Sequence, residues 1–198
     1  MKTITYKKTV TKPILEITYD GCADSPREWS SLGYFITAER NYNSPDKEAS
    51  LEYAVKTMGE SANSCDEHME LIKEYLASDE TSFSEEVIYI VPVSKFEHSG
   101  VIYRRGEEHG WDSGVCGFYI VTKESAERLG TPSDRFQKVI DEELKVYTQY
   151  ANGDVYAFVL FDEEGKVKDS CGGFYDINDI KEYLPEEWKD EDLSEYMK

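Results

Sequence analysis

The apolar residues of this chain fall into short runs that alternate with polar residues and end at turn-forming positions. This pattern predicts β-strands in residues 3–10, 14–19, 32–37, 87–93, 101–103, 115–121, 155–161 and 167–175. The run over 87–93 is apolar at nearly every position and predicts a central strand. Because proline cannot donate a ladder hydrogen bond, Pro92 is expected to end that strand or to lie at a sheet edge.

Four other segments carry helical periodicity or helix-start and helix-stop residues, namely 45–59, 64–76, 123–129 and 134–151. Ser64 is answered by Glu67 at capping-box spacing, and Asn152-Gly153 closes the last segment. A short helical turn is also expected after Ser25, which can cap it, and Thr122 can cap the segment 123–129. In the last segment an apolar seam runs from Phe136 to Ala151. The sequence therefore predicts an α+β fold, with a single domain of mainly antiparallel sheet and about five helices packed on it.

One stretch, residues 110–121, combines a turn rich in glycine and polar residues with an apolar strand. A second stretch, 169–175, repeats Asp-Ser, Cys-Gly and Phe-Tyr in the same order. We interpret both as strand entries of similar construction. In this interpretation Trp111, like Trp29, packs over the sheet.

Charge changes this picture more than any other property of the composition. The 198 residues include 41 acidic and 22 basic side chains, a net charge of −19. Such a field repels nucleic acid and anionic membranes and attracts basic surfaces. We therefore expect no direct nucleic-acid binding, no membrane binding and a basic protein as partner.

The acidic residues are concentrated in two segments. Residues 45–86, predicted as an acidic two-helix insertion, hold 12 acidic residues and three lysines, and residues 176–198, predicted as an acidic C-terminal helical tail, hold nine acidic residues and three lysines. The candidate binding surface combines the first segment with residues 134–143. Its members are Glu48, Glu52, Glu60, Asp66, Glu67, Glu70, Glu74, Asp134, Asp141, Glu142 and Glu143.

The four cysteines are dispersed, without a Cys-x-x-Cys pair, so a zinc site is not expected. No EF-hand spacing occurs, and we predict neither a metal nor a cofactor. The N-terminus lacks the apolar core of a signal peptide, and no run approaches 18 apolar residues. The sequence predicts a cytoplasmic protein with reduced thiols.

A second hypothesis is a small cytosolic enzyme with a Cys/His/Asp site formed by the turns at 110–116 and 169–173. Its candidate residues are Trp111, Asp112, Cys116, Asp169 and Cys171. A nucleophilic thiolate needs a neighbouring base or a positive environment, and the acidic field of this chain works against a lowered thiol pKa. We therefore predict a protein that is not an enzyme.

Three segments carry a family resemblance: residues 24–33 with Ser-Pro-Arg-Glu-Trp, residues 110–114 with Trp-Asp-Ser-Gly, and residues 147–156 with Gly-Asp-Val-Tyr. In this order they resemble an uncharacterised family of small acidic proteins encoded by bacteriophages and prophages. The resemblance covers residues 14–176. The chain departs from it at Ser30-Ser31, where Asp-Asn is expected, and at Ala157, where glycine is expected.

The resemblance implies a non-structural protein made in the cytoplasm of an infected bacterium. Small acidic proteins from that setting often inhibit defence nucleases, so our first hypothesis is a counter-defence inhibitor of the anti-restriction or anti-CRISPR type that mimics DNA. Its expected partner is a basic, nucleic-acid-binding host nuclease or effector. A third hypothesis is a structural module that self-associates through its aromatic surface, as a possible homodimer.

Overall fold

The computed structural model describes residues 14–39 and 42–198 and confirms the α+β class with antiparallel sheets. Where the sequence suggested one sheet, the described chain forms two, and it divides into two compact units. One unit comprises residues 25–152, and the other comprises residues 14–24 and 153–198. The strand predicted at 3–10 lies outside the described residues, and the single domain stays a prediction.

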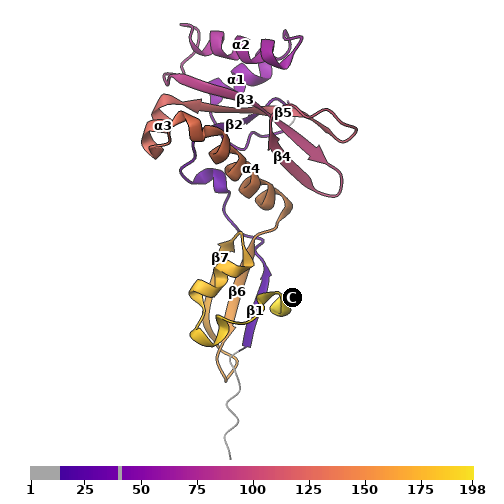
Figure 1. The fold of residues 1–198 in the computed structure, drawn as a ribbon, viewed down its shortest axis with the longest axis vertical. Helices are drawn as coiled ribbons and strands as arrows, with labels where there is room; N and C mark the ends of the chain where they lie inside the picture. Colours follow the sequence, from indigo (N-terminus) through magenta and orange to yellow (C-terminus); the bar gives the residue numbers. More distant parts are fainter. Residues whose placement is uncertain (1–13, 40–41) are drawn as a thin grey trace, which may run out of the picture. The chain divides into compact units, whose positions relative to one another are not determined.

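The unit of residues 25–152 is built on a four-stranded sheet in the order β2-β5-β3-β4, with every neighbouring pair antiparallel (Figure 1). Its strands are β2 (Tyr34–Thr37), β3 (Val87–Glu97), β4 (Val101–Arg105) and β5 (Ser113–Thr122). The apolar run of β5 is buried from Cys116 onwards, as expected for a strand covered on both faces.

Helices cover both faces of this sheet. On one face, α1 (Ala49–Met58) and α2 (Cys65–Leu76) pack on Ile36, Phe118 and Ile120 through residues such as Leu51 and Ile72. On the other face, α3 (Lys123–Leu129) and α4 (Phe136–Asn152) enclose Phe35 and Tyr119. The segment predicted as an acidic insertion therefore packs on one face of the sheet.

Local capping residues set several helix boundaries as predicted. Ser64 accepts a hydrogen bond from the Glu67 amide, and Thr122 and Ser125 form a complete capping box at the start of α3. Gly130 ends α3 with φ 62°, in the left-handed region. The expected capping box at Ser64 is only half formed, because the Glu67 side chain instead binds the amide of Asn63.

Pro92 lies inside β3, so the prediction that it ends the strand is wrong. It lies one residue beyond the part of β3 that pairs with β4, in line with the alternative of a sheet edge. It pairs with Phe118 of β5, and its carbonyl accepts a hydrogen bond from the Gly106 amide, just beyond the end of β4. In an antiparallel strand the nitrogen and the carbonyl of one residue point to the same neighbour. The missing donor of Pro92 therefore faces β4, and no hydrogen bond of the β3–β5 ladder is lost.

Side chains occupy both outer edges of the four-stranded sheet. On β4, Thr148 and Asn152 of α4 bind the amides of Tyr103 and Val101. On β2, the amides of Phe35 and Thr37 donate to Asp46 and Ser44, respectively. These contacts satisfy backbone groups that would otherwise invite pairing with another strand.

The other unit holds a three-stranded antiparallel sheet in the order β1-β6-β7, formed by β1 (Ile14–Tyr19), β6 (Tyr156–Phe161) and β7 (Val167–Phe174). The C-terminal tail forms short 3-10 helices over this sheet, η3 (Ile177–Tyr183), η4 (Glu186–Trp188) and η5 (Leu193–Tyr196). Leu184 and Trp188 are buried in its core, whereas Tyr183 remains largely exposed.

Candidate functional site

The candidate acidic residues of α1 and α2 lie on the outer sides of both helices, opposite the buried stripe that contacts the sheet. Glu52 pairs with Lys56 and Glu70 with Lys73, while Glu48 and Glu67 bind backbone amides near the helix starts. The Asn63 amide lowers the pKa of the Glu67 carboxyl, because it stabilises the charged form.

Asp66, Glu70 and Glu74 form one row along α2. They are spaced four residues apart and all three are exposed. At a rise of about 1.5 Å per residue, successive carboxylates start about 6 Å apart along the axis. Asp66 and Glu74 make no ion pair with any residue that the structure describes. Asp66, Glu70 and Glu74 are here named the acidic row. They are the most regularly spaced of the acidic residues predicted as the binding surface.

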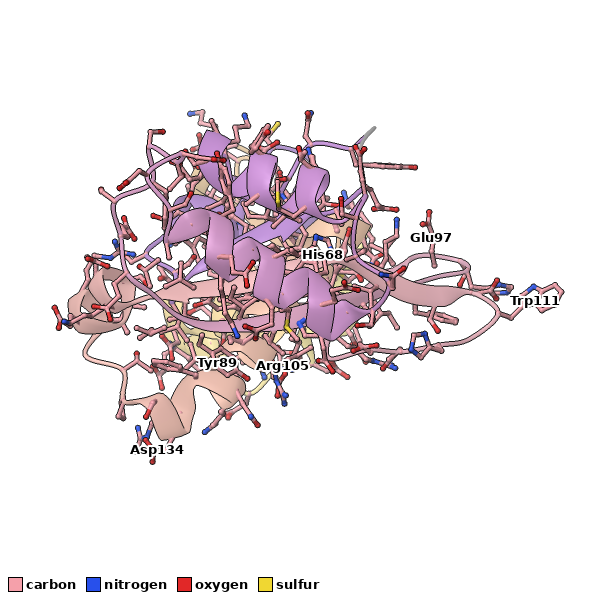
Figure 2. All side chains as sticks on the ribbon, turned by 90° about the horizontal axis from the view of Figure 1, so that it is seen from above. His68, Tyr89, Glu97, Arg105, Trp111 and Asp134 are labelled. Atoms are coloured by element: carbon pink, nitrogen blue, oxygen red, sulfur yellow. The ribbon has the colours of Figure 1, made fainter. Side chains whose placement is uncertain are left out.

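The acidic residues predicted around α4 have different surroundings. Asp134 is exposed in η2 (Ser133–Arg135), at the edge of the view in Figure 2, and Asp141 forms a two-point ion pair with Arg105. Glu142 is exposed and lies 3.7 Å from the Lys138 ammonium. Glu143 instead turns inward, with only 20% of its side chain exposed, and contacts Arg27.

Arg27 is the centre of a buried polar network that the sequence analysis did not identify. Its side chain is 3% exposed, and its guanidinium donates to Asp46 at 2.6 Å, to Glu143 at 2.6 Å and to the Gly33 carbonyl at 2.7 Å. The guanidinium also lies over the Tyr119 ring, 5.3 Å from its centre. These contacts join the turn η1 (Pro26–Glu28) to the segment before α1, to α4 and to β5.

The acceptors of this network bind further backbone groups. Asp46 accepts from the Phe35 amide, and Glu143 accepts from the Leu32 amide and from the Tyr119 hydroxyl. Burial would lower the pKa of Arg27, but Tyr119, Asp46 and Glu143 raise it, so the guanidinium stays charged. Burial raises the pKa of Asp46 and Arg27 opposes that change. Every named group has a partner, as a buried charged cluster requires.

This network is architecture of the fold, and one sequence feature pointed to it. Arg27 belongs to the Ser-Pro-Arg-Glu-Trp segment that carries the family resemblance. Asp46 and Tyr119 stand in unremarkable contexts, and only the tertiary structure brings them to Arg27. Next to the network, Trp29, Pro26 and Val146 line a shallow cavity of about 170 Å³.

The residues of the alternative enzymatic site are distributed over both compact units. Cys116 belongs to β5 of one unit, whereas Asp169 and Cys171 belong to β7 of the other. Cys116 is 3% exposed, and burial raises the pKa of its thiol to about 12. Cys171 is exposed, with its thiol directed to the carbonyl of Gly172. Neither unit by itself brings together the predicted set.

Trp111 contradicts the interpretation that it packs over the sheet. Its side chain is 100% exposed, and Figure 2 shows it at the outer tip of a projecting β-ribbon. The neighbouring Asp112 contacts the His98 ring at 3.4 Å. Trp29 is 53% exposed. The glycine-rich context of Trp111 resembled a strand entry, but the turn projects beyond the helices that could have covered the indole.

Another polar group inside the four-stranded unit is His68, which the helical pattern did not place in the core. It is 9% exposed, lies 2.8 Å from the Val55 carbonyl and meets the Phe118 ring edge to face. Burial lowers the pKa of this imidazole. Among the described residues, no group of three or more His, Cys, Asp or Glu side chains is arranged to hold a metal ion.

Comparison of this chain with models of protein families, with curated proteins and with solved structures found no match. Within the described part of the chain, no helix is both long enough and apolar enough to cross a membrane.

Proposed function

We propose that this protein is a non-enzymatic inhibitor that blocks the nucleic-acid-binding site of a basic host protein with its acidic surface. The observation that carries the proposal is the acidic row of α2, Asp66, Glu70 and Glu74, exposed on a helix whose other side is anchored on the sheet. Because α2 is anchored, its backbone keeps the spacing of the row on binding, which lowers the entropic cost of the complex.

The electrostatic reason is the energy that nucleic-acid-binding proteins gain from phosphates. Duplex DNA carries about one charge per 1.7 Å of axis, and basic proteins that bind it gain free energy by releasing counterions. A protein with a net charge of −19 that holds its carboxylates in rows offers basic side chains a similar field. A basic DNA-binding cleft is therefore the surface that fits this protein.

The resemblance to a bacteriophage and prophage family supplies the proposed setting, the cytoplasm of an infected bacterium. The proposed targets are restriction enzymes and RNA-guided nucleases, whose channels for nucleic acid are rich in Lys and Arg. Within the described residues, no arrangement of side chains favours the enzymatic alternative, because its candidate residues belong to two different compact units.

The test is competition with duplex DNA for purified restriction enzymes and RNA-guided nucleases. We expect the protein to displace DNA from its target, with an affinity that falls steeply between about 50 mM and about 500 mM salt. The triple variant Asp66→Asn, Glu70→Gln, Glu74→Gln should bind about tenfold more weakly at the lower salt concentration, since electrostatic attraction sets much of this affinity.

The matched control removes the same number of charges elsewhere. Glu186, Glu187 and Asp190 are exposed near η4 in the other compact unit, and neutralising them should leave competition near the wild-type level. Equal losses in both triple variants would mean that only net charge matters. Absence of competition with every target tested, or binding that does not change with salt, contradicts the proposal.

A further inference from the structure

The backbone holds Trp111 at the tip of a well-defined turn. Gly110 and Ser113 exchange two backbone hydrogen bonds of 3.4 and 3.5 Å, which leaves Trp111 and Asp112 as a two-residue turn. The Asp112 carbonyl also accepts from the Glu97 amide at 2.9 Å, at the end of β3. These bonds hold the backbone of Trp111 at the tip of the turn, while the indole itself stays fully exposed.

Such a turn is preorganised for binding. Tryptophan is among the residues most enriched at binding hot spots, because its ring loses much water contact and little conformational freedom on burial. In the isolated molecule the fully exposed Trp111 side chain does not gain the free energy of burial, which a binding partner can supply. The turn formed by residues 110–113, here named the Trp111 turn, therefore has the properties of an anchor.

The same unit contains a groove of about 480 Å³ between β4 and α4, here named the β4–α4 groove. Ile102, Tyr103 and Leu144 contribute apolar surface to it. Its polar lining includes Arg104, Arg105 and Lys145 together with Glu108 and Asp141. Three cations thus face two carboxylates, a local excess of positive charge on a chain whose net charge is −19.

Charge complements the apolar fit between the turn and the groove. Asp112 has a contact with His98 at 3.4 Å, and an imidazole lacks the permanent charge of an ammonium or guanidinium group. Arg104 and Arg105 are paired with Glu108 and Asp141, whereas Lys145 has no ion pair within the described residues. Lys145 is therefore available to a carboxylate beside Trp111.

We propose that the protein self-associates by placing the Trp111 turn of one copy in the β4–α4 groove of a second copy. Nucleic acid is a poor occupant of the groove, because it would meet Glu108, Asp141 and the acidic field of the whole chain. The Trp111 turn of another copy brings an indole for the apolar surface and the Asp112 carboxylate for Lys145. An exchange of turns about a two-fold axis forms this contact twice.

This proposal is independent of the proposed inhibitory function, because it requires only the protein itself. The first test is sedimentation velocity over a series of protein concentrations. We expect concentration-dependent association of the wild type, and the variant Trp111→Ala should associate at least about tenfold more weakly. Trp29→Ala is the matched control, since Trp29 is also exposed but lines a different cavity, and it should associate like the wild type.

A charge exchange tests which surfaces meet. Lys145→Glu and Asp112→Lys should each weaken association, because each places like charges at the contact. An equimolar mixture of the two variants should restore association, since every turn in a mixed pair then meets a groove of opposite charge. Both sites are at least partly exposed, so the isolated copies are expected to fold, which thermal unfolding will verify.

Three results would overturn the proposal. The first is a wild type that remains monomeric at all concentrations. This result counts against the proposal even if Trp111 proves to bind vesicles of zwitterionic lipid. The second is association that Trp111→Ala leaves unchanged. The third is a mixture of Lys145→Glu and Asp112→Lys that associates no better than either variant alone.

Discussion

Arg27 is the residue that holds together the buried charged network of the four-stranded unit. Two carboxylates, a carbonyl and an aromatic ring surround its guanidinium, and the two carboxylates are themselves only 12% and 20% exposed. A buried ion pair adds little net stability while it is complete, but removal of one member leaves the remaining charges without compensation. The contribution of each of these three charged side chains to stability therefore depends on the other two.

The first prediction is that Arg27→Met destabilises the protein by about 3–5 kcal/mol, since Asp46 and Glu143 then lie near each other without a cation. Chemical denaturation followed by circular dichroism measures this loss. The control Arg104→Met removes an arginine whose side chain is 55% exposed, and it should change stability by less than about 0.5 kcal/mol. Equal effects of the two substitutions would show that the buried network has no special importance.

His68 leads to a second prediction, about pH. Burial lowers the pKa of His68 in the folded state, so the unfolded chain takes up a proton more readily. The contribution of His68 to the free energy of unfolding is fully present above the unfolded pKa of about 6.5. It decreases as the pH falls from there towards the folded pKa. We expect His68→Gln to lose less stability than the wild type between about pH 7 and about pH 5.

The control for this prediction is His109→Gln, because the His109 side chain is 80% exposed. Unfolding free energies at several pH values should decline in that variant as in the wild type. A His68→Gln variant with the same decline would mean that His68 does not carry the predicted pH dependence.

Single residues were predicted well where the local sequence determines their role. Ser25, Ser64 and Thr122 cap as expected, because a cap binds amides only two or three residues away. Glu143 and Trp111 were not predictable in this way. Each depends on which distant segment lies beside it: Arg27 and Tyr119 bind Glu143 from inside the unit, whereas no element of the described chain covers Trp111.

At the scale of elements, most helices and strands were predictable because their apolar periodicity is strong. The prediction placed the start of α4 two residues too early, at Asp134. Residues 133–135 form the separate turn η2, and α4 begins at Phe136. Ala151, predicted on the buried seam of α4, is exposed, since the inward face ends near Tyr147. The long β3, which continues through Pro92, could not be predicted without knowing that β4 ends beside it.

The third prediction concerns the contact between α4 and the edge strand β4. Asn152 accepts from the Val101 amide at 2.8 Å and donates to the Val101 carbonyl at 2.7 Å, so one side chain replaces two ladder hydrogen bonds. We expect Asn152→Ala to cost about 1–2 kcal/mol. Amide hydrogen exchange should become faster chiefly in β4, because the lost bonds hold that strand at the sheet edge.

Gln137→Ala is the control for this substitution, as Gln137 is exposed on the same helix and contributes no hydrogen bond to β4. It should leave the exchange of β4 unchanged. Faster exchange spread equally over all strands after Asn152→Ala would contradict a local role for Asn152.

At the scale of the whole chain, the apolar cores follow the division into two compact units. Both core clusters of the four-stranded sheet consist of residues between Leu32 and Leu144. The third cluster combines Leu15 and Ile17 with residues from Phe158 to Leu193. The sequence could not reveal this division, because β1 and β6 pair across a separation of more than 130 residues and periodicity reports only local structure.

The fourth prediction is that the fragment of residues 25–152 folds without the rest of the chain. Its two core clusters and its sheet are complete within the fragment, and both edges of the sheet are occupied by its own side chains. We expect a cooperative thermal transition and dispersed amide resonances. A fragment without tertiary structure would show that its core depends on the other unit.

A second molecule, made only of the three-stranded unit, tests whether that unit also folds by itself. In the three-stranded unit, the Asp20 amide donates to the Val155 carbonyl at 2.7 Å, so the two chain segments of that unit run close together where they leave the sheet. A short Gly-Ser linker can therefore join residues 14–22 directly to residues 154–198. Because Trp188 is 1% exposed within that core, folding of the joined chain should shift its fluorescence emission to shorter wavelength, and urea should reverse the shift. Emission typical of an exposed tryptophan before urea is added would contradict an autonomous three-stranded unit, even if the fragment of residues 25–152 folds.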